Sequence, residues 1–337
     1  MSVILTSKEI TDDAIKLIGQ FQKGTIKPIS CGDDAFGQWL NNSLLGGLLP
    51  GTICSISGPS GMGKTHLLQR IENHIIETEK DVVLLRVQWE GSPLNLILRK
   101  IYQKTGLKMK DVLFNKQTGS NLEAIRKVTD EERQPNVFVI QKILSSSEFY
   151  NEVSEFLKLH LDKKVVISLD HTTLVKGNTK EAVDSLFEAF NRLKREHPYC
   201  CFLPLVQSER TRLQERLGNH KTENPNRSDL YGSDGIYQLS DLVLFLYDPY
   251  KAGALQKYMV FNKKKYNYIS PEFIIDGGST WNHFNPINNI FYHLIKIRDI
   301  NDIENIQDVF VESKLGITKE TNSPTSPIKT VDEELDF

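Results

Sequence analysis

Charge of one sign, cysteine and long apolar runs are all scarce in this sequence. Its 41 lysines and arginines stand against 43 aspartates and glutamates, which gives a formal net charge of −2. The chain as a whole is therefore not a basic nucleic-acid binder, and any nucleic-acid site has to be a local patch such as the pore of a ring.

The four cysteines and the apolar runs exclude further classes of protein. Cys31, Cys54, Cys200 and Cys201 have neither metal-ligand spacing nor a small-scaffold disulfide pattern, so we expect free thiols in a reducing cytoplasm. Residues 1–30 lack the apolar core of a signal peptide. The strongest apolar run, 242–247, is too short to span a bilayer, so no membrane partner is expected.

The 337 residues are enough for one large α/β domain with extensions or for two small domains. From about residue 28 to residue 284, strand-like and helix-like segments alternate, which predicts a parallel sheet with crossover helices. Several of the strand-like segments are continuous apolar runs, as in strands buried on both faces. The predicted strands are 52–57, 82–87, 137–140, 165–169, 202–206 and 242–247, with later and antiparallel strands at 257–262 and 272–276. The predicted helices include 64–78, 93–104 and 180–196.

Both ends of the chain differ from this central domain, which we place at 28–308. Residues 1–27 hold one amphipathic helix, from Ser7 to about Lys23, which packs either on its own core or on a neighbouring subunit. In the tail, 309–337, the stretch 318–327 is rich in Thr, Ser, Asn and Pro and is expected to be disordered. The tail ends in an acidic tip closed by Phe337, which fits either a solubilising tail or a partner-binding tip.

One motif carries specific chemistry. Residues 58–65, Gly-Pro-Ser-Gly-Met-Gly-Lys-Thr, match the phosphate-binding P-loop pattern between a predicted strand and a predicted helix. Glycines let backbone N–H groups point at phosphates, the lysine reaches the β- and γ-phosphates, and the threonine hydroxyl ligates Mg²⁺. We therefore predict an ATP and Mg²⁺ site. Its expected phosphate-binding residues are Gly58, Ser60, Gly61, Met62, Gly63, Lys64 and Thr65.

Hydrolysis also needs acidic residues, and two follow predicted strands. Asp170 ends the strand 165–169, where a second ligand for Mg²⁺ is expected, although such a residue could also cap a turn. Glu90 follows the strand 82–87 and could polarise the attacking water, or it could be a surface glutamate. Spacing alone does not decide the role of Glu90.

Together these segments resemble the motor domains of DnaB-type replicative DNA helicases. The lead-in 46–51 (Gly-Gly-Leu-Leu-Pro-Gly) and the segment 90–99 after Glu90 have the family's order. Asp170 and Leu174 match its Walker-B segment Asp-Tyr-Leu-Gln-Leu only at the first and last positions. The segment 228–242 aligns without a gap on Ser-Asp-Leu-Arg-Glu-Ser-Gly-Ser-Ile-Glu-Gln-Asp-Ala-Asp-Leu. The resemblance implies a RecA-like P-loop core, with a mostly parallel sheet flanked by helices.

The resemblance also implies roles for individual residues. Glu90 becomes the general base, Asp170 the Walker-B acid and Gln207 the strand-end sensor of the γ-phosphate or DNA. In the neighbouring subunit's site, Lys263 matches the family's trans lysine and Lys265 replaces its arginine finger, which predicts a weaker finger because lysine lacks the planar fork of arginine. A pore loop is expected at 210–227. Its candidate contacts to DNA phosphates, which could also be solvated loop residues, are Arg210, Arg212, Lys221 and Arg227.

The expected function is therefore an ATP-driven motor that moves on single-stranded DNA as a homo-oligomeric ring, most simply a hexamer. The first helix resembles the linker helix that the family docks on the adjacent subunit. The family's N-terminal domain has no counterpart, a short form that fits a phage or mobile-element protein in a bacterial or infected cell. A primase or loader is an expected partner, with the acidic tip as one candidate contact. Two alternatives stay open: a RecA-like recombinase, and a P-loop loader or regulator that does not unwind DNA.

Overall fold

The structure is a computed structural model that describes residues 6–24, 26–115, 117–208, 227–231 and 234–247 as nearly continuous chain. Beyond these, it describes the short strands that lie between residues 259 and 321. The account below concerns these residues alone.

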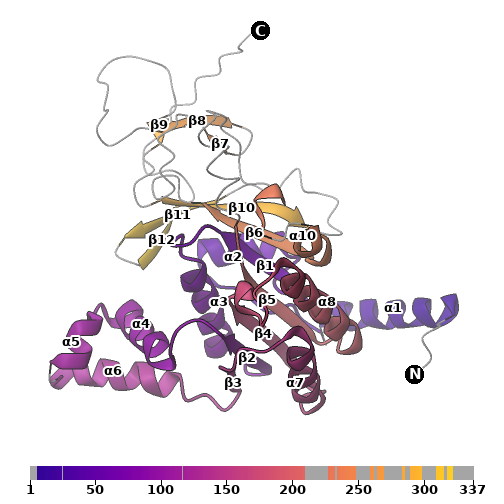
Figure 1. Cartoon of the computed structure of the whole chain (residues 1–337), viewed down its shortest axis with the longest axis horizontal. Coiled ribbons are helices and arrows are strands. Elements are labelled where there is room, and N and C mark those ends of the chain that lie inside the picture. Colours follow the sequence, from indigo (N-terminus) through magenta and orange to yellow (C-terminus); the bar gives the residue numbers. More distant parts are fainter. Residues whose placement is uncertain are drawn as a thin grey trace, which may run out of the picture.

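A nine-stranded sheet forms the centre of the chain, in the order β12-β11-β10-β6-β1-β5-β4-β2-β3 (Figure 1). The strands from β6 to β3 in this order run parallel, as the apolar runs in the sequence predict. They are β1 (Cys54–Gly58), β2 (Val82–Gln88), β3 (Val137–Ile140), β4 (Lys164–Asp170), β5 (Cys200–Gln207) and β6 (Leu242–Tyr247). Their carboxyl ends meet at one edge, which is where parallel α/β sheets bind ligands.

Helices cover both faces of the sheet. On one face lie α7 (Ser146–Lys158) and α8 (Lys180–Glu196), and on the other α2 (Ala35–Ser43) and α3 (Lys64–Thr78). The short elements η1 (Thr172–Leu174), η2 (Arg227–Asp229) and α10 (Asp234–Leu239) follow the ends of β4 and β5. Two hydrophobic cores result, one on each side of the sheet.

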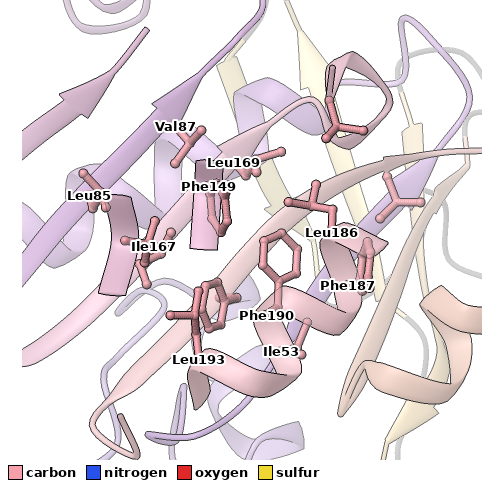
Figure 2. Packing of buried hydrophobic residues seen from close by; sticks show 14 of the residues in the cluster. Ile53, Leu85, Val87, Phe149, Ile167, Leu169, Leu186, Phe187, Phe190 and Leu193 are labelled. Carbon is pink, nitrogen blue, oxygen red and sulfur yellow. The ribbon is translucent and has the colours of Figure 1, made fainter. Parts of the chain in front are cut away.

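The alternation of side chains along the strands builds these two cores. In β4, Val165, Ile167 and Leu169 face α7 and α8, whereas Val166 faces α3. Aromatic rings fill the α8 side: Phe149 and Phe190 pack edge to face with ring centroids 5.4 Å apart. Figure 2 shows this cluster between the sheet and α8. Burial on both faces explains why these strands read as nearly unbroken apolar runs.

Two helical parts project from the core on opposite sides (Figure 1). One is α1 (Ser7–Gln22), which extends away from the sheet. The other is a helical lobe made of α4 (Pro93–Thr105), α5 (Met109–Phe114) and α6 (Gly119–Glu131), inserted between β2 and β3. In the described part of the chain, no helix combines the length and apolar character that crossing a bilayer requires.

The far end of the sheet goes beyond the sequence prediction. Strand β10 (Asn289–Ile297) pairs antiparallel with β6, and β11 (Val309–Lys314) and β12 (Ile317–Thr321) continue the sheet into the stretch assigned to the tail. The expected disorder is therefore wrong for 318–321, where pairing with β11 supplies the order that the local composition does not predict. The segment 309–311, Val-Phe-Val, has strand-forming residues, but it is too short to show periodicity.

A second sheet contains β7 (Met259–Phe261), β8 (Lys264–Tyr268) and β9 (His283–Phe284). The β7–β8 pair is antiparallel, as expected. The predicted strand 272–276 and the acidic tip lie outside the described residues.

Candidate nucleotide-hydrolysis site

The P-loop lies between β1 and α3 and depends on glycine for its shape. The φ angles of Gly58, Gly61 and Gly63 are 147°, 82° and 91°, in the region that favours glycine. A Cβ atom on Gly58 would lie 2.5 Å from the carbonyl oxygen of Leu246 on β6, so no side chain fits there. The strand–loop–helix setting that the motif requires is therefore present.

Lys64 lies inside the loop, where its ammonium donates hydrogen bonds to the carbonyl oxygens of Gly58, at 2.7 Å, and Pro59, at 3.0 Å. The side chain is buried. Of the other predicted phosphate-binding residues, Ser60 and Gly61 are exposed, whereas the Met62 side chain packs in the core beside α2 and α3. Met62 thus anchors the loop from behind, and only its backbone is available to a phosphate.

Asp170 ends β4 opposite the start of α3. Its carboxylate lies 3.5 Å from the Thr65 hydroxyl, which donates to it. Burial, and after it the nearby charge of Glu90, raise the pKa of Asp170 to about 6, while the Thr65 hydrogen bond opposes both. A half-buried carboxylate beside a second carboxylate, with a hydroxyl in reach, is a donor set that suits Mg²⁺.

Glu90 is brought to this edge by its neighbour Trp89. The Trp89 ring is buried in the core and donates from Nε1 to the carbonyl oxygen of Lys142 at 2.9 Å. The backbone N–H groups of Trp89 and Glu90 both donate to the carbonyl oxygen of Asp170, at 3.0 and 3.3 Å. The Glu90 side chain is 60% exposed, so it projects from a fixed backbone into the open edge of the site.

Gln207 ends β5, the strand between β4 and β1. It is in register with Gly58 of the P-loop. Its backbone carbonyl accepts from the N–H of Tyr231 at 3.0 Å, and Ser208 forms an antiparallel bridge with Leu230. The strand end therefore joins the P-loop to the segment 228–231, the start of the stretch with the closest family match.

The structure thus brings Lys64, Thr65, Asp170, Glu90 and Gln207 to one edge of the sheet. The remaining candidates are placed less fully. Arg227 begins η2, with its guanidinium carbon 6.0 Å from the ring centre of Tyr237. The backbone of Lys265 lies in β8, paired with Val260. Arg210, Arg212, Lys221 and Lys263 lie outside the described residues.

Sequence reasoning missed three residues that hold the site. Trp89 and His171 are the first two; each follows a strand end, and its only signal in the sequence is its position beside an acid. The third is Asp241, whose carboxylate accepts from the N–H of Ile53 at 2.8 Å and from Lys194 of α8 at 2.7 Å. Asp241 therefore fixes the start of β1, and its place in the Ser-Asp-Leu triplet before β6 was the available signal.

The comparison with protein families gives this edge a context. The model of the DnaB-like helicase C-terminal domain family matches residues 38–275, which is more than half of the chain. The chain belongs to this family. The match contains the P-loop, Glu90, Asp170, Gln207 and the lysines of β8.

Individual relatives of this DnaB-like domain agree. The chain is 26% identical over 250 residues to the replicative DNA helicase DnaB of Helicobacter pylori strain 26695, and 27% identical over 251 residues to that of strain J99. Each match covers 72% of this chain and 49% of the relative, so the chain spans about half the length of the curated relatives it matches.

Two solved structures share the fold. One is a separately solved ATPase domain, which superposes with a TM-score of 0.64 at 15% identity, covering 89% of this chain and 94% of that one. The other, a DnaB-like replicative helicase described with its interactions with primase, superposes with a TM-score of 0.63 at 14% identity, covering 91% of this chain and 65% of that one. At these identities the superpositions support the RecA-like architecture alone.

Proposed function

We propose that this chain is the motor of an ATP-driven replicative helicase, which moves on single-stranded DNA as a ring of identical subunits. The observation that carries the proposal is the convergence of Lys64, Thr65, Asp170 and Glu90 at the carboxyl edge of the sheet. These residue types together bind a nucleoside triphosphate and hydrolyse it. The relatives that match over most of this chain are named replicative DNA helicases.

In nucleotide binding, the ammonium of Lys64 exchanges its two carbonyl acceptors for phosphate oxygens. The backbone N–H groups of the P-loop and the N-terminus of α3 add positive partial charge. The Thr65 hydroxyl and the Asp170 carboxylate hold Mg²⁺, which neutralises charge on the phosphates when bound. Because the pKa of Asp170 is raised to about 6, chiefly by burial, the cation also stabilises the ionised form of this side chain.

In hydrolysis, Glu90 takes the role of general base. Its carboxylate accepts the proton of the water whose oxygen attacks the γ-phosphorus, and the bond from that phosphorus to the β–γ bridging oxygen breaks. The backbone bonds of Trp89 and Glu90 to Asp170 keep the base a fixed distance from the magnesium ligands. Gln207, at the end of β5, links the phosphates to the chain that follows, where Arg210, Arg212, Lys221 and Arg227 are the proposed DNA-phosphate contacts.

The ring is supported by two exposed apolar surfaces. The first surface, on α1, contains Ile15 and Ile18. The second, on the lobe, contains Leu113 and Phe114 of α5. They project on opposite sides of the core (Figure 1), so α1 of one subunit packs on the lobe of the next, and such a head-to-tail contact closes into a ring. In the ring, Lys263 and Lys265 act on the neighbouring subunit's nucleotide.

The first experiment measures ATP hydrolysis with and without a single-stranded oligonucleotide, for the wild type and for Glu90→Gln. We expect DNA to stimulate the wild type. We expect Glu90→Gln to lower kcat by about 10² to 10⁴-fold, the usual contribution of a general base. Binding of a fluorescent ATP analogue should be retained, because Glu90 holds neither phosphate nor Mg²⁺. Glu152→Gln, an exposed carboxylate on α7, is the control.

The alternatives predict different results. Hydrolysis without any stimulation by DNA would reject the translocase and favour a loader or regulator that depends on a partner. Stimulation accompanied by DNA-dependent filaments rather than rings, in electron micrographs, would favour a recombinase. Hydrolysis that survives Glu90→Gln would reject the assignment of the base.

A further inference from the structure

His171 lies between two residues of the proposed hydrolysis site. It follows Asp170 directly and is buried, with 8% of its surface exposed. Its Nε2 atom lies 3.3 Å from the side-chain nitrogen of Gln207 and 3.9 Å from Oε2 of Glu90. One ring nitrogen therefore faces both the strand-end glutamine and the proposed general base.

The ring is held in this place by its own turn. The Nδ1 atom lies 3.3 Å from the Thr173 hydroxyl, and the carbonyl oxygen of His171 accepts from the N–H of Leu174. The next residue, Thr172, is buried and donates from its hydroxyl to the carbonyl oxygen of Leu205 on β5 at 3.0 Å. The turn is thereby fastened to the strand that carries Gln207.

The chemistry of a neutral imidazole limits what Nε2 can do. Burial lowers the pKa of His171, the nearby ammonium of Lys64 lowers it further, and Glu90 opposes both. In the neutral ring one nitrogen donates and the other accepts. When Nδ1 donates to Thr173, Nε2 accepts from the Gln207 amide. When Nε2 carries the hydrogen, it donates to the Glu90 carboxylate. A single Nε2 cannot serve both groups at once.

We propose that His171 is a positioning residue that links Gln207 to Glu90, so that release of His171 by Gln207 lets the ring hold Glu90 in place for hydrolysis. The inference rests on the proposed function, because it takes Glu90 as the base. It goes beyond that function because the matching family segment has tyrosine, not histidine, after the aspartate. The distance of 3.9 Å closes to a hydrogen bond through rotation of the exposed Glu90 side chain alone.

The test compares two substitutions of His171. His171→Gln keeps a polar atom near the position of Nε2, whereas His171→Phe keeps the ring and loses every polar atom. We expect His171→Phe to lower the DNA-stimulated kcat by about 10- to 100-fold, the effect of misplacing a catalytic group. KM for ATP and affinity for a fluorescent ATP analogue should change less than about twofold, since only the chemical step is affected. His171→Gln should recover most of the rate.

A double-mutant cycle with Gln207→Ala separates a link from two independent effects. If His171 transmits the state of Gln207, the His171→Phe/Gln207→Ala double variant should lose no more of the DNA stimulation than the stronger single variant. The control is His197→Phe at the end of α8, far from the site.

The outcomes distinguish this inference from the proposed function. If Glu90→Gln abolishes hydrolysis while His171→Phe leaves kcat unchanged, the base stands and the link is rejected. If His171→Phe weakens nucleotide binding or thermal stability as much as it lowers kcat, or if the losses in the cycle are additive, the link is also rejected. If Glu90→Gln itself leaves hydrolysis unchanged, the proposed function fails first.

Discussion

Asp170 shows how a binding residue can work against the stability of its own fold. Burial and the charge of Glu90 raise the pKa of its carboxyl from 3.8 to about 6. Because the folded pKa lies above the unfolded one, the stability that this group contributes is present below pH 3.8 and is lost as the pH rises through 6. At pH 7.5, the ionised carboxylate of the nucleotide-free protein therefore destabilises the folded state.

Asp170→Asn should consequently stabilise the protein and disable it. At pH 7.5 without nucleotide, we expect the free energy of unfolding to rise by about 1 to 3 kcal/mol, because the amide avoids both the desolvation and the repulsion. The extra thermal stability that Mg²⁺ and ATP give the wild type should disappear in the variant. Thermal unfolding with and without Mg-ATP measures both effects, with the exposed Asp162→Asn as control. A lower melting temperature for the nucleotide-free variant would contradict this account.

Single residues could be predicted from sequence where chemistry fixes their spacing, and not where the fold does. The P-loop could be read because eight consecutive residues build it. The role of Glu90 depends on β2 lying beside β4, and that of His171 depends on β5 lying beside β4. Neither neighbour is visible in the sequence without the strand order, so no role for His171 could be predicted.

At the scale of elements, a buried chain of charges fastens the lobe to the sheet. Lys100 of α4, none of which is exposed, pairs with Glu132 at the end of α6. Glu132 also accepts from Arg86 of β2 at 2.9 Å, and Arg86 donates to Glu72 of α3 at 2.9 Å. Glu72 in turn accepts from the hydroxyl of Ser168, two residues before the end of β4. The base of the lobe is thus tied to the strand that carries the magnesium ligand.

Removing the shared carboxylate should cost much more than removing an exposed one. Burial, and after it the charge of Arg86, lower the pKa of Lys100 to about 8, while Glu132 opposes both. We expect Glu132→Gln to lower the free energy of unfolding by about 3 to 5 kcal/mol, since it leaves two cations buried without their partner. Chemical denaturation provides the measurement.

The matched control is Glu77→Gln, whose partner Lys104 lies one turn further along α4 in an exposed pair at 2.7 Å. That change should cost at most about 1 kcal/mol. The double variant Glu132→Gln/Lys100→Met should regain part of the loss, because the unpaired ammonium is removed with its partner. Equal costs for the two glutamate variants would show that the buried chain does not hold the lobe.

The elements themselves were predicted unevenly, for a physical reason. Strands buried on both faces read as apolar runs, so β1 to β6 could be found. Arg86 and Lys100 looked like ordinary surface charges, because the partner Glu132 is remote in sequence from both. Strands β10 to β12 carry mixed polar and apolar residues, and their pairing with β6 and with one another gives no local pattern.

At the scale of the whole molecule, the two projecting apolar surfaces pose a problem of burial. Phe114 on α5 is 78% exposed and Ile18 on α1 is 54% exposed. They lie on opposite sides of the core (Figure 1), so one subunit cannot bury them against each other. A head-to-tail neighbour covers both at once, and repetition of this contact gives the proposed ring.

This arrangement predicts an asymmetric result when two damaged chains are mixed. Ile18→Asp damages only the α1 surface, and Phe114→Asp damages only the lobe surface, so each variant alone should be monomeric by light scattering. In an equimolar mixture, the intact α1 of the Phe114→Asp chain can dock on the intact lobe of the Ile18→Asp chain. Both remaining surfaces of that pair are damaged, so assembly should stop at a heterodimer. Leu159→Asp, at an equally exposed apolar position on the other helical face, should assemble like the wild type. Rings of unchanged mass for either single variant would show that these surfaces are not the contact between subunits.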